Sequence, residues 1–291
     1  MTTHIHTFDR HRSHLFGIAY RMLGSVMDAE DMVQETFLRW QTVRETAVKS
    51  PKAFLTSIVT RLSIDQLRSA RMQRESYIGP WLPEPLLQTE AEEGAERMLI
   101  LSESLSLAFM LLLEKLTPTE RAVFLLRQVF DYDYSEIATL VDKSEGNCRQ
   151  IFRRAKQRID SQRPRFEPKA ETHEQLLMAF YGACFTGDLD GLLALLADDV
   201  VATSDGGGKA RAARRPVLGA ENVARFMMGL TRLAPDGFAI RLQQVNEALG
   251  VVGYSHGQPM MVVVPEIRNG RIYAIRSILN PDKLQNIPPL A

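Results

Sequence analysis

Three prolines within six residues divide this chain more sharply than any other feature of its sequence. The stretch GPWLPEPL, Gly79 to Leu86, cannot form a helix interior or a sheet centre, because proline fixes φ and lacks a backbone N–H. We expect a stiff, extended, polyproline-like connector. A plain tether does not need a tryptophan and a leucine on such a rod. The sequence therefore predicts that Trp81 and Leu82 dock against another part of the chain.

The composition is that of a globular protein, with 45% apolar and 24% charged residues among 291. No stretch approaches the roughly 20 apolar residues that a membrane span needs, and the first residues contain no apolar secretory segment. Two cysteines, Cys148 and Cys184, are expected to be reduced thiols rather than a disulfide scaffold. We therefore expect a cytoplasmic protein with no membrane partner.

Charge is sorted into blocks although the formal net charge is zero. The segment from Arg149 to Arg165 is strongly basic, whereas Glu84 to Glu103 carries six acids against one arginine. The polar positions between Asp28 and Glu35 are mostly acidic. Such blocks suggest specific partners or mutual masking.

The pattern of apolar residues and breakers divides the chain into four parts. The fold class that it indicates is multidomain, with two all-α units followed by a small α+β domain. The expected boundaries are residues 1–75 for the first helical unit, 76–104 for the linker, 105–165 for the second helical unit and 170–291 for the α+β domain. In the last domain, Asn269-Gly270 predicts a tight hairpin turn.

The second helical unit contains a helix-turn-helix pattern. In TPTE, Thr117 is a capping residue, Pro118 takes the first helical position and Glu120 closes a capping box. A short helix is expected to end near Val141, and Ser144 is expected to cap a longer one. The apolar stripe of this longer helix is Cys148, Ile151, Phe152, Ala155 and Ile159. Its solvent face carries Asn, Gln and Arg side chains, which can make bidentate contacts to base edges, so we expect it to bind DNA.

The first helical unit offers two weaker features. In DAEDMVQETFLRW, Asp28 is expected to cap a helix that buries Ala29, Val33, Thr36 or Phe37, and Trp40. The next helix is expected to bury Phe54, Ile58, Leu62 and Leu67. The acidic face of the former and the arginines of the latter fit solvated helix surfaces equally well when taken alone.

Together these segments resemble a known family. DAEDMVQETFLRW resembles region 2.2 of the extracytoplasmic-function (ECF) sigma factors, and AFLTSIVTRLSIDQLRSARMQRE resembles their regions 2.3–2.4. TPTERAVFLLRQVFDYDYSEIATLVDKSEGNCRQIFRRAKQRI resembles their region 4. WLPEP, DGGGK and NPDKL further resemble the sigma-J type, which carries a C-terminal SnoaL-like domain of the nuclear-transport-factor-2 (NTF2) fold.

The resemblance implies an alternative sigma factor that directs core RNA polymerase to promoters. It implies contacts with the β′ clamp helices and the β flap of the polymerase, and with double-stranded promoter DNA. The implied core-binding residues are Asp28, Glu30, Asp31, Gln34 and Glu35. The implied −10 residues are Arg61, Arg68, Arg71 and Arg74. The implied −35 residues are Ser144, Asn147, Arg149, Gln150, Arg153, Arg154 and Lys156.

The same resemblance suggests that the SnoaL-like domain regulates the protein in cis by gripping the connector. The expected connector residues are Trp81, Leu82, Pro83, Glu84 and Pro85. The expected contact segments of the domain are Asp205, Gly206, Gly207, Gly208 and Lys209 together with Asn280, Pro281, Asp282, Lys283 and Leu284. The three glycines are expected to permit close backbone approach, because DGGGK lacks the spacing of a phosphate-binding loop.

The residues nominate no catalytic group, cofactor or metal. His256 is expected in a turn, and the clustered His4, His6, His11 and His14 are expected to be solvated, since no carboxylate or cysteine joins them at a ligand spacing. We therefore expect no enzyme. The alternative that the residues leave open is a DNA-binding regulator fused to a polyketide-cyclase-like or ligand-sensing domain.

Overall fold

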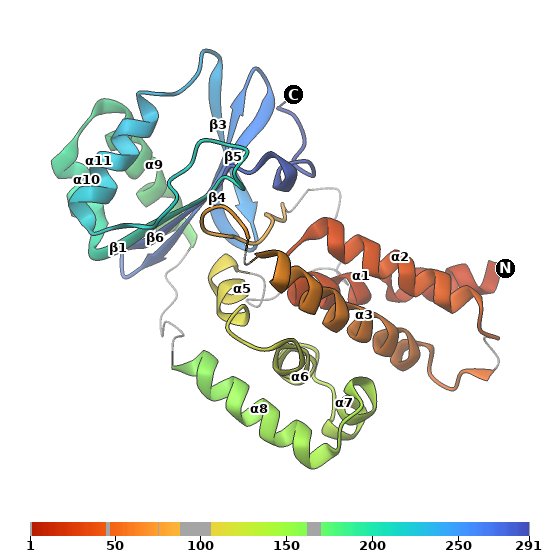
Figure 1. Ribbon diagram of the computed structural model, residues 1–291. Helices are drawn as coiled ribbons and strands as arrows, with labels where there is room; N and C mark the ends of the chain where they lie inside the picture. The colour runs from red at the N-terminus through yellow and green to blue at the C-terminus, as the bar shows by residue number, and fades with distance from the viewer. Residues whose placement is uncertain (1, 45–46, 75, 88–105, 162–169, 291) are drawn as a thin grey trace. The chain divides into compact units, whose positions relative to one another are not determined.

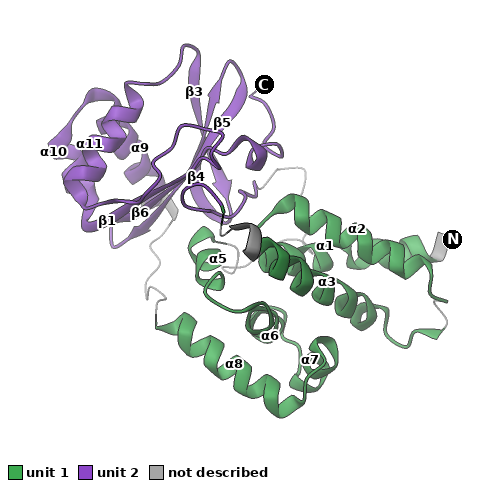
Figure 2. Cartoon of the chain, viewed as in Figure 1, with its two compact units in different colours: residues 1–76, 89–163 green, residues 77–88, 164–291 purple. Residues whose placement is uncertain are grey.

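The computed structural model describes residues 2–44, 47–74, 76–87, 106–161 and 170–290, with the backbone alone at 2–3, 71–74 and 170–172. The chain forms two compact units (Figure 2). Unit 1 contains residues 1–76 and 89–163, and unit 2 contains residues 77–88 and 164–291. The chain therefore passes into unit 2, returns to unit 1 and leaves it again.

The first helical part of unit 1 consists of α1 (Thr2–Leu23), α2 (Val26–Gln41) and α3 (Pro51–Arg74) (Figure 1). Helix α2 buries Ala29, Val33, Thr36 and Trp40, as the sequence predicts. The predicted cap is wrong. The side chain of Ser25 accepts the backbone N–H of Asp28 at 3.2 Å, so Ser25 is the N-cap and Asp28 lies in the first turn.

Helix α3 buries a different face from the predicted one. Leu55, Val59, Ile64 and Leu67 are buried, while three of the predicted stripe are only half-buried, namely Phe54, Ile58 and Leu62. The polar Thr56, Thr60 and Ser63 are also fully buried. The reason is that α3 packs against α1 and α2 and also against helices of the second helical part, so no single stripe describes its buried surface.

The second helical part of unit 1 consists of α5 (Leu107–Leu113), α6 (Pro118–Gln128), α7 (Tyr134–Val141) and α8 (Glu145–Asp160). The capping box of Thr117 and Glu120 is present, and Ser144 caps α8. The left-handed Asp142 ends α7. Helix α8 buries Cys148, Ile151, Ala155 and Ile159, while Phe152 is half-buried and stacks on Phe124. The predicted helix-turn-helix is confirmed.

Two of the clustered histidines are not solvated, contrary to expectation. His4 Nε2 forms a hydrogen bond with the Val43 carbonyl at 2.9 Å, and its ring lies beside Trp40. His14 forms a hydrogen bond with the Tyr132 hydroxyl at 2.9 Å. Both belong to α1, whose inward face is packed over most of its length. Their partners could not be inferred from neighbouring residues, because Val43 and Tyr132 are 39 and 118 positions away along the chain.

Unit 2 is built on a six-stranded sheet of order β2-β1-β6-β5-β4-β3. The strands are β1 (Leu196–Asp205), β2 (Val217–Leu218), β3 (Phe238–Val245), β4 (Ala248–Ser255), β5 (Gln258–Arg268) and β6 (Arg271–Ile278). Strands β1 and β6 run parallel, and the other neighbouring pairs run antiparallel. The predicted hairpin turn at Asn269-Gly270 joins β5 and β6, with positive φ at both residues.

Helices α9 (Ala170–Thr186), α10 (Leu189–Leu195) and α11 (Ala220–Thr231) cover one face of the sheet (Figure 1). Their core includes Phe180, Val223 and Ile275. Side chains of the opposite face, including Val252, Val262 and Ile278, are buried as well. The predicted fold class, two helical units followed by an α+β domain, is confirmed. None of the described helices is both long and apolar enough to cross a membrane.

Candidate functional site

The acidic residues of α2 lie mainly on its solvent face. Asp31 and Gln34 are exposed, while Glu30 receives Arg12 at 2.5 Å and Glu35 receives Arg39 at 2.8 Å. Asp28 is half-buried and accepts a hydrogen bond from Gln66 at 3.1 Å. The exposed ion pairs are weak and can exchange for a partner's charges. Four of the five predicted residues therefore face solvent together, and Asp28 is mainly tied to α3.

Two exposed apolar residues extend this face. Met27 is 52% exposed and Leu38 is 50% exposed. With Asp31 and Gln34 they stand at i, i+4, i+7 and i+11, which places all four along one stripe of a helix. Met27 and Leu38 are not among the residues predicted from the sequence, in which their spacing was the available signal. Met27 and Leu38 therefore add exposed apolar surface to the same stripe as Asp31 and Gln34.

The arginines of α3 are not equivalent. Arg61 donates from Nε to the Leu140 carbonyl and from Nη2 to the Thr139 carbonyl, both at 3.2 Å. Arg68 is exposed and pairs with Asp65, one turn away on the same helix, at 3.0 Å. Arg71 and Arg74 belong to α3, but their side chains lie outside the described residues. Of the two arginines whose side chains the structure describes, Arg61 binds another helix and Arg68 pairs within its own.

The recognition helix α8 presents its polar residues on two adjacent stripes, all of them exposed. One stripe is Asn147, Gln150 and Arg154, and the other is Arg149, Arg153 and Lys156. Within the first stripe the spacing is three and four residues, which is one helix face. The Ser144 hydroxyl is occupied, because it accepts the backbone N–H of Asn147 at 3.3 Å. Six of the seven predicted residues therefore form one continuous polar surface, and Ser144 acts as its cap.

Two arginines of α8 have structural partners. Arg149 pairs with Glu145 and lies over the Tyr134 ring, 5.0 Å from its centroid. The hydrogen bond and charge of Glu145 raise the pKa of Arg149. Arg158 reaches Glu120 at 2.9 Å and so joins α8 to the capping box of α6. Arg158 was not among the predicted residues, and it faces the packed side of the motif.

In unit 2, a buried carboxylate accepts hydrogen bonds from the connector. Asp205, the last residue of β1, has no exposed surface. Its Oδ1 accepts the Tyr77 hydroxyl at 2.5 Å, and its Oδ2 accepts the backbone N–H of Leu82 at 2.8 Å. Oδ1 also accepts the Gly207 N–H at 3.1 Å. Burial and the neighbouring carboxylate raise the pKa of Tyr77, so its hydroxyl stays protonated and donates.

Lys283 completes this cluster from the short 3-10 helix η4 (Pro281–Lys283). Its ammonium lies 2.7 Å from Asp205 Oδ2 and also donates to the Leu82 carbonyl. The ammonium stands over the Trp81 ring at 4.3 Å and the Tyr77 ring at 5.3 Å from the centroids. The charge of Lys283 is thus satisfied by a carboxylate, a carbonyl and two aromatic faces.

The other end of the connector contacts the turn between β3 and β4. The Leu86 N–H donates to Asn246 Oδ1 at 3.0 Å, and the Asn246 N–H donates to the Leu86 carbonyl at 2.9 Å. Leu87 bridges Val245 in antiparallel fashion. Between these ends, Pro83, Glu84 and Pro85 are buried, and Glu84 accepts Asn286 at 2.8 Å. The segment is therefore seated along its length.

The glycines of DGGGK permit this seating. Gly207 and Gly208 have φ of +59° and +73°, which disfavours any other residue. A Cβ atom at Gly208 would lie 2.8 Å from Ile78, and one at Gly207 would collide with Asn280. The expectation of close backbone approach is confirmed. Outside this turn, Lys209 pairs with Asp282 at 2.6 Å, an exposed link between the two predicted contact segments.

The family models and relatives agree on one assignment. Residues 7–72 match Sigma-70 region 2, and residues 106–159 match Sigma-70 region 4. The ECF RNA polymerase sigma factor SigJ of Mycobacterium tuberculosis is 37% identical over 97% of this chain and 93% of the relative. The chain belongs to the ECF sigma factors. The probable ECF sigma factor SigI of the same species is 30% identical over 94% of this chain and 92% of its own.

The fold of this sigma factor also resembles a solved relative. The crystal structure of M. tuberculosis SigJ has a TM-score of 0.79 and 34% identity, covering 97% of this chain and 98% of that one. The family consists of transcription initiation factors without enzymatic activity. This protein is thus an alternative sigma factor, and core RNA polymerase and promoter DNA are its partners.

Sequence reasoning missed several members of the sigma factor's connector site. Tyr77, Asn246 and Asn286 each hold or receive a hydrogen bond at the docked segment. Tyr77 lies two residues before the glycine that opens GPWLPEPL, which was the available signal. The two asparagines gave none, because their partners lie about 160 and 202 positions away in sequence.

Proposed function

We propose that the predicted sets divide the work of promoter recognition. The exposed α2 face binds the β′ clamp helices, the α3 arginines contact the −10 element, and the polar surface of α8 reads the −35 element. The observation in support is the co-location of Asn147, Gln150 and Arg154 on one exposed helix face that follows a well-capped turn. Amide and guanidinium groups pair with base edges, and the flanking cations suit phosphates.

We further propose that unit 2 regulates the sigma factor in cis through the connector. The single observation that carries this proposal is the set of contacts made by the buried Asp205 carboxylate. It accepts hydrogen bonds from Tyr77 and Leu82 of the connector and pairs with Lys283 near the end of the domain. Because Asp205 binds the connector at both Tyr77 and Leu82, this part of the connector is held in one conformation. The linker connects the two DNA-reading parts, so its freedom affects their separation.

Run-off transcription with core polymerase tests the proposal. The full chain is compared with a chain that ends at Lys169 and with a chain carrying Asp205→Asn, at equal concentrations of folded protein. Transcription that depends on the added chain supports the sigma assignment. A change of output in both altered chains supports regulation through unit 2, and identical output in all three chains contradicts it. Met178→Ala is the matched control for Asp205→Asn, because Met178 lies in the same unit, on α9, and is exposed.

A further inference from the structure

A loop of unit 2 carries a group of exposed arginines that none of the sites described above uses. This arginine loop, residues 206–216, joins β1 to β2 (Figure 1). Its Lys209 is paired with Asp282, whereas Arg211, Arg214 and Arg215 are all exposed. Within the described part of the chain, these three guanidinium groups form no hydrogen bond or ion pair. Their like charges therefore repel one another with no carboxylate to compensate them.

Small residues hold the backbone of the arginine loop against the domain. The N–H groups of Lys209 and Ala210 both donate to the Gly206 carbonyl at 2.9 Å. A Cβ atom at Gly206 would lie 2.5 Å from the Ala210 carbonyl oxygen and 2.7 Å from Ala212 Cβ, so the chain packs closely on itself there. Ala212 and Ala213 are half-buried, whereas the arginines that flank them are exposed. The long charged side chains thus project from a backbone that is already fixed, which lowers the entropy cost of binding.

The arginine loop also lies against the connector, within unit 2. A Cβ atom at Gly79 would lie 3.8 Å from Arg214 Cα, and one at Gly208 would lie 2.8 Å from Ile78. From Arg74, the last residue of α3, to Gly79 the chain advances by five residues, which reach at most about 18 Å. Whatever the arrangement of the two units, this covalent limit keeps Arg214 near the end of α3.

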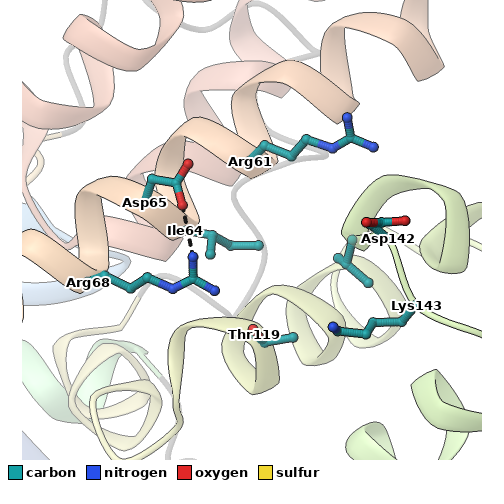
Figure 3. A pocket seen from close by; sticks show the side chains of 8 residues that line it. Arg61, Ile64, Asp65, Arg68, Thr119, Asp142 and Lys143 are labelled. Atoms are coloured by element: carbon teal, nitrogen blue, oxygen red, sulfur yellow. Dashed lines mark hydrogen bonds and ion pairs between the residues drawn. The ribbon is translucent and has the colours of Figure 1, made fainter.

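A pocket of unit 1, in contrast, balances the cations that line it. The pocket has a volume of about 550 Å³ and lies between α3 and the turn that follows α7. Figure 3 shows Arg68 bound to Asp65 there, with Asp142 next to Lys143. Arg61 donates to two carbonyls of α7. Uncompensated positive charge is the electrostatic footprint of a surface that binds a polyanion, and the arginine loop has that character while this pocket does not.

Phosphate groups of DNA fit the arginine loop better than a protein surface does. A guanidinium group is planar and binds a phosphate through two parallel N–H donors. Between Lys209 and Pro216 the loop contains no aromatic residue to anchor a protein partner. It also contains no Asn or Gln, the residues that pair with adenine edges. The loop therefore offers charge for a DNA backbone without a set of residues that reads bases.

We propose that Arg211, Arg214 and Arg215 form a phosphate-binding surface for promoter DNA, on the duplex backbone next to the −10 element. The proposal rests on the proposed role of the α3 arginines at that element, because the chain from Arg74 to Gly79 limits how far the loop lies from them. Phosphate contacts carry no sequence information, so the loop adds affinity and not promoter choice. The α+β domain then takes a direct part in DNA binding, separate from its contacts with the connector.

The salt dependence of DNA binding tests this surface. The full chain is combined with core polymerase and titrated onto a promoter duplex and a scrambled duplex across a salt series. The test variant carries Arg211→Gln, Arg214→Gln and Arg215→Gln. We expect the slope of log affinity against log salt to fall by about two to three units on both duplexes, since each phosphate contact contributes about 0.9. At physiological salt, affinity for both duplexes is expected to fall roughly tenfold or more.

The matched control removes the same charge from unit 2 outside the arginine loop. It carries Arg225→Gln, Arg232→Gln and Arg241→Gln, three exposed arginines, and it should keep the wild-type slope. An equal loss of slope in the control overturns the proposal, because overall charge would then explain the effect. A wild-type slope in the folded test variant overturns it too. So does weaker binding of the test variant to core polymerase without DNA, since the loop would then contact a protein.

Tethered cleavage of the DNA locates the contact. An iron chelate is attached through Arg215→Cys, while Cys148 and Cys184 are both buried. Cleavage is expected within about ten base pairs of the −10 element, given the reach of the chain and about 3.4 Å per base pair. Cleavage confined to the −35 element, or none, overturns the proposal. The wild type's preference for the promoter over the scrambled duplex reports the proposed reading roles of α3 and α8, so their failure is visible apart from that of the loop.

Discussion

The ammonium of Lys283 lies 2.7 Å from Asp205 Oδ2, with 11% and 0% of the two side chains exposed. Removal of one member of a buried ion pair leaves an uncompensated charge, which typically costs about 3–5 kcal/mol. We expect Asp205→Asn to release the connector, because it weakens the contacts of Lys283, Tyr77 and the Leu82 N–H together. Hydrogen exchange at the Leu82 amide measures this release. Protection equal to that of the wild type would show that the ion pair does not hold the segment.

Trp81→Ala is expected to change regulation and not the fold of unit 1. The substitution removes an aromatic face that lies 4.3 Å from the Lys283 ammonium, an interaction worth about 0.5–2 kcal/mol. We expect removal of residues 280–291 to raise promoter activity, since Lys283 and Asn280 leave the site. Removal of the whole domain is expected to abolish activity, because the connector then has no surface on which to hold an active spacing.

That prediction is checked by measuring transcription, and the distance between the two DNA-reading helical parts, on these three chains. The circular dichroism of each whole chain serves as the control for folding. If all three chains match the wild type in both assays, GPWLPEPL is only a spacer.

Charge reversal on α2 is expected to abolish binding to core polymerase. The change is Asp31→Lys with Glu35→Lys, two residues of one exposed face. Asp9→Lys on α1 is the matched control, since it is also an exposed acid of the same unit. A pull-down with core enzyme measures the effect. Retained binding by the folded double variant would remove α2 from the interface, and Met27→Ala then tests whether apolar contact dominates.

The polar residues of α8 are expected to differ in their response to DNA sequence. Gln150→Ala or Arg153→Ala should weaken binding to the −35 element by about 1–3 kcal/mol each if either pairs with a base edge. Lys156→Ala should weaken binding to all DNA equally and lower the salt dependence by about one unit of slope. Binding to −35 and scrambled duplexes across a salt series measures both. Wild-type affinity of the first two variants for both duplexes would contradict base reading by these residues.

Stability of the wild type is expected to fall between pH 6.5 and about pH 4 because of His14. Burial lowers its pKa from 6.5 to about 4, with further lowering by Lys52, His11 and Arg21. In this window the unfolded chain binds the proton and the folded chain does not, so stability rises with pH and is lost as pH falls. The expected slope is at most about 1.4 kcal/mol per pH unit.

Urea unfolding at pH 7 and pH 5.5 measures this effect in the wild type and in His14→Gln, which keeps an acceptor for Tyr132. The glutamine variant should lose less stability than the wild type between the two values. Glu120 and Glu266 contribute little to the difference between pH 7 and pH 5.5, since the pKa of each is lowered in the folded chain from 4.5, and 4.5 already lies below both pH values. An equal loss in both chains would mean that His14 is not the titrating group.

Features that depend on neighbouring residues were predictable from the sequence. The box of Thr117 and Glu120, the cap at Ser144 and the Asn269-Gly270 turn each follow from side chains within four residues of one another. The exposed set on α8 follows from the stripe that is buried behind it. Local chemistry fixes these elements whatever the rest of the chain does.

Features that depend on distant partners were not predictable. The buried face of α3 was misplaced because α6 and α7 cover a second side of that helix. His14 was expected in solvent because nothing near it in sequence indicates Tyr132, which is 118 positions away. The connector site was anticipated in outline from its prolines and glycines, but its centre at Asp205 and its contact with Asn246 needed the sheet to be in place.

The interleaving of the two units has a consequence for how the protein is made. Residues 77–88 leave the ribosome long before Asp205 and Lys283, with which they pack. At roughly 5–20 residues per second, the roughly 200 residues between the connector and Lys283 take on the order of 10–40 s to synthesise. During that interval both DNA-reading parts have been synthesised, while the connector still lacks the residues of unit 2 that bind it. Every nascent chain therefore passes through a stage at which its helical parts are synthesised and the residues that hold the connector are not.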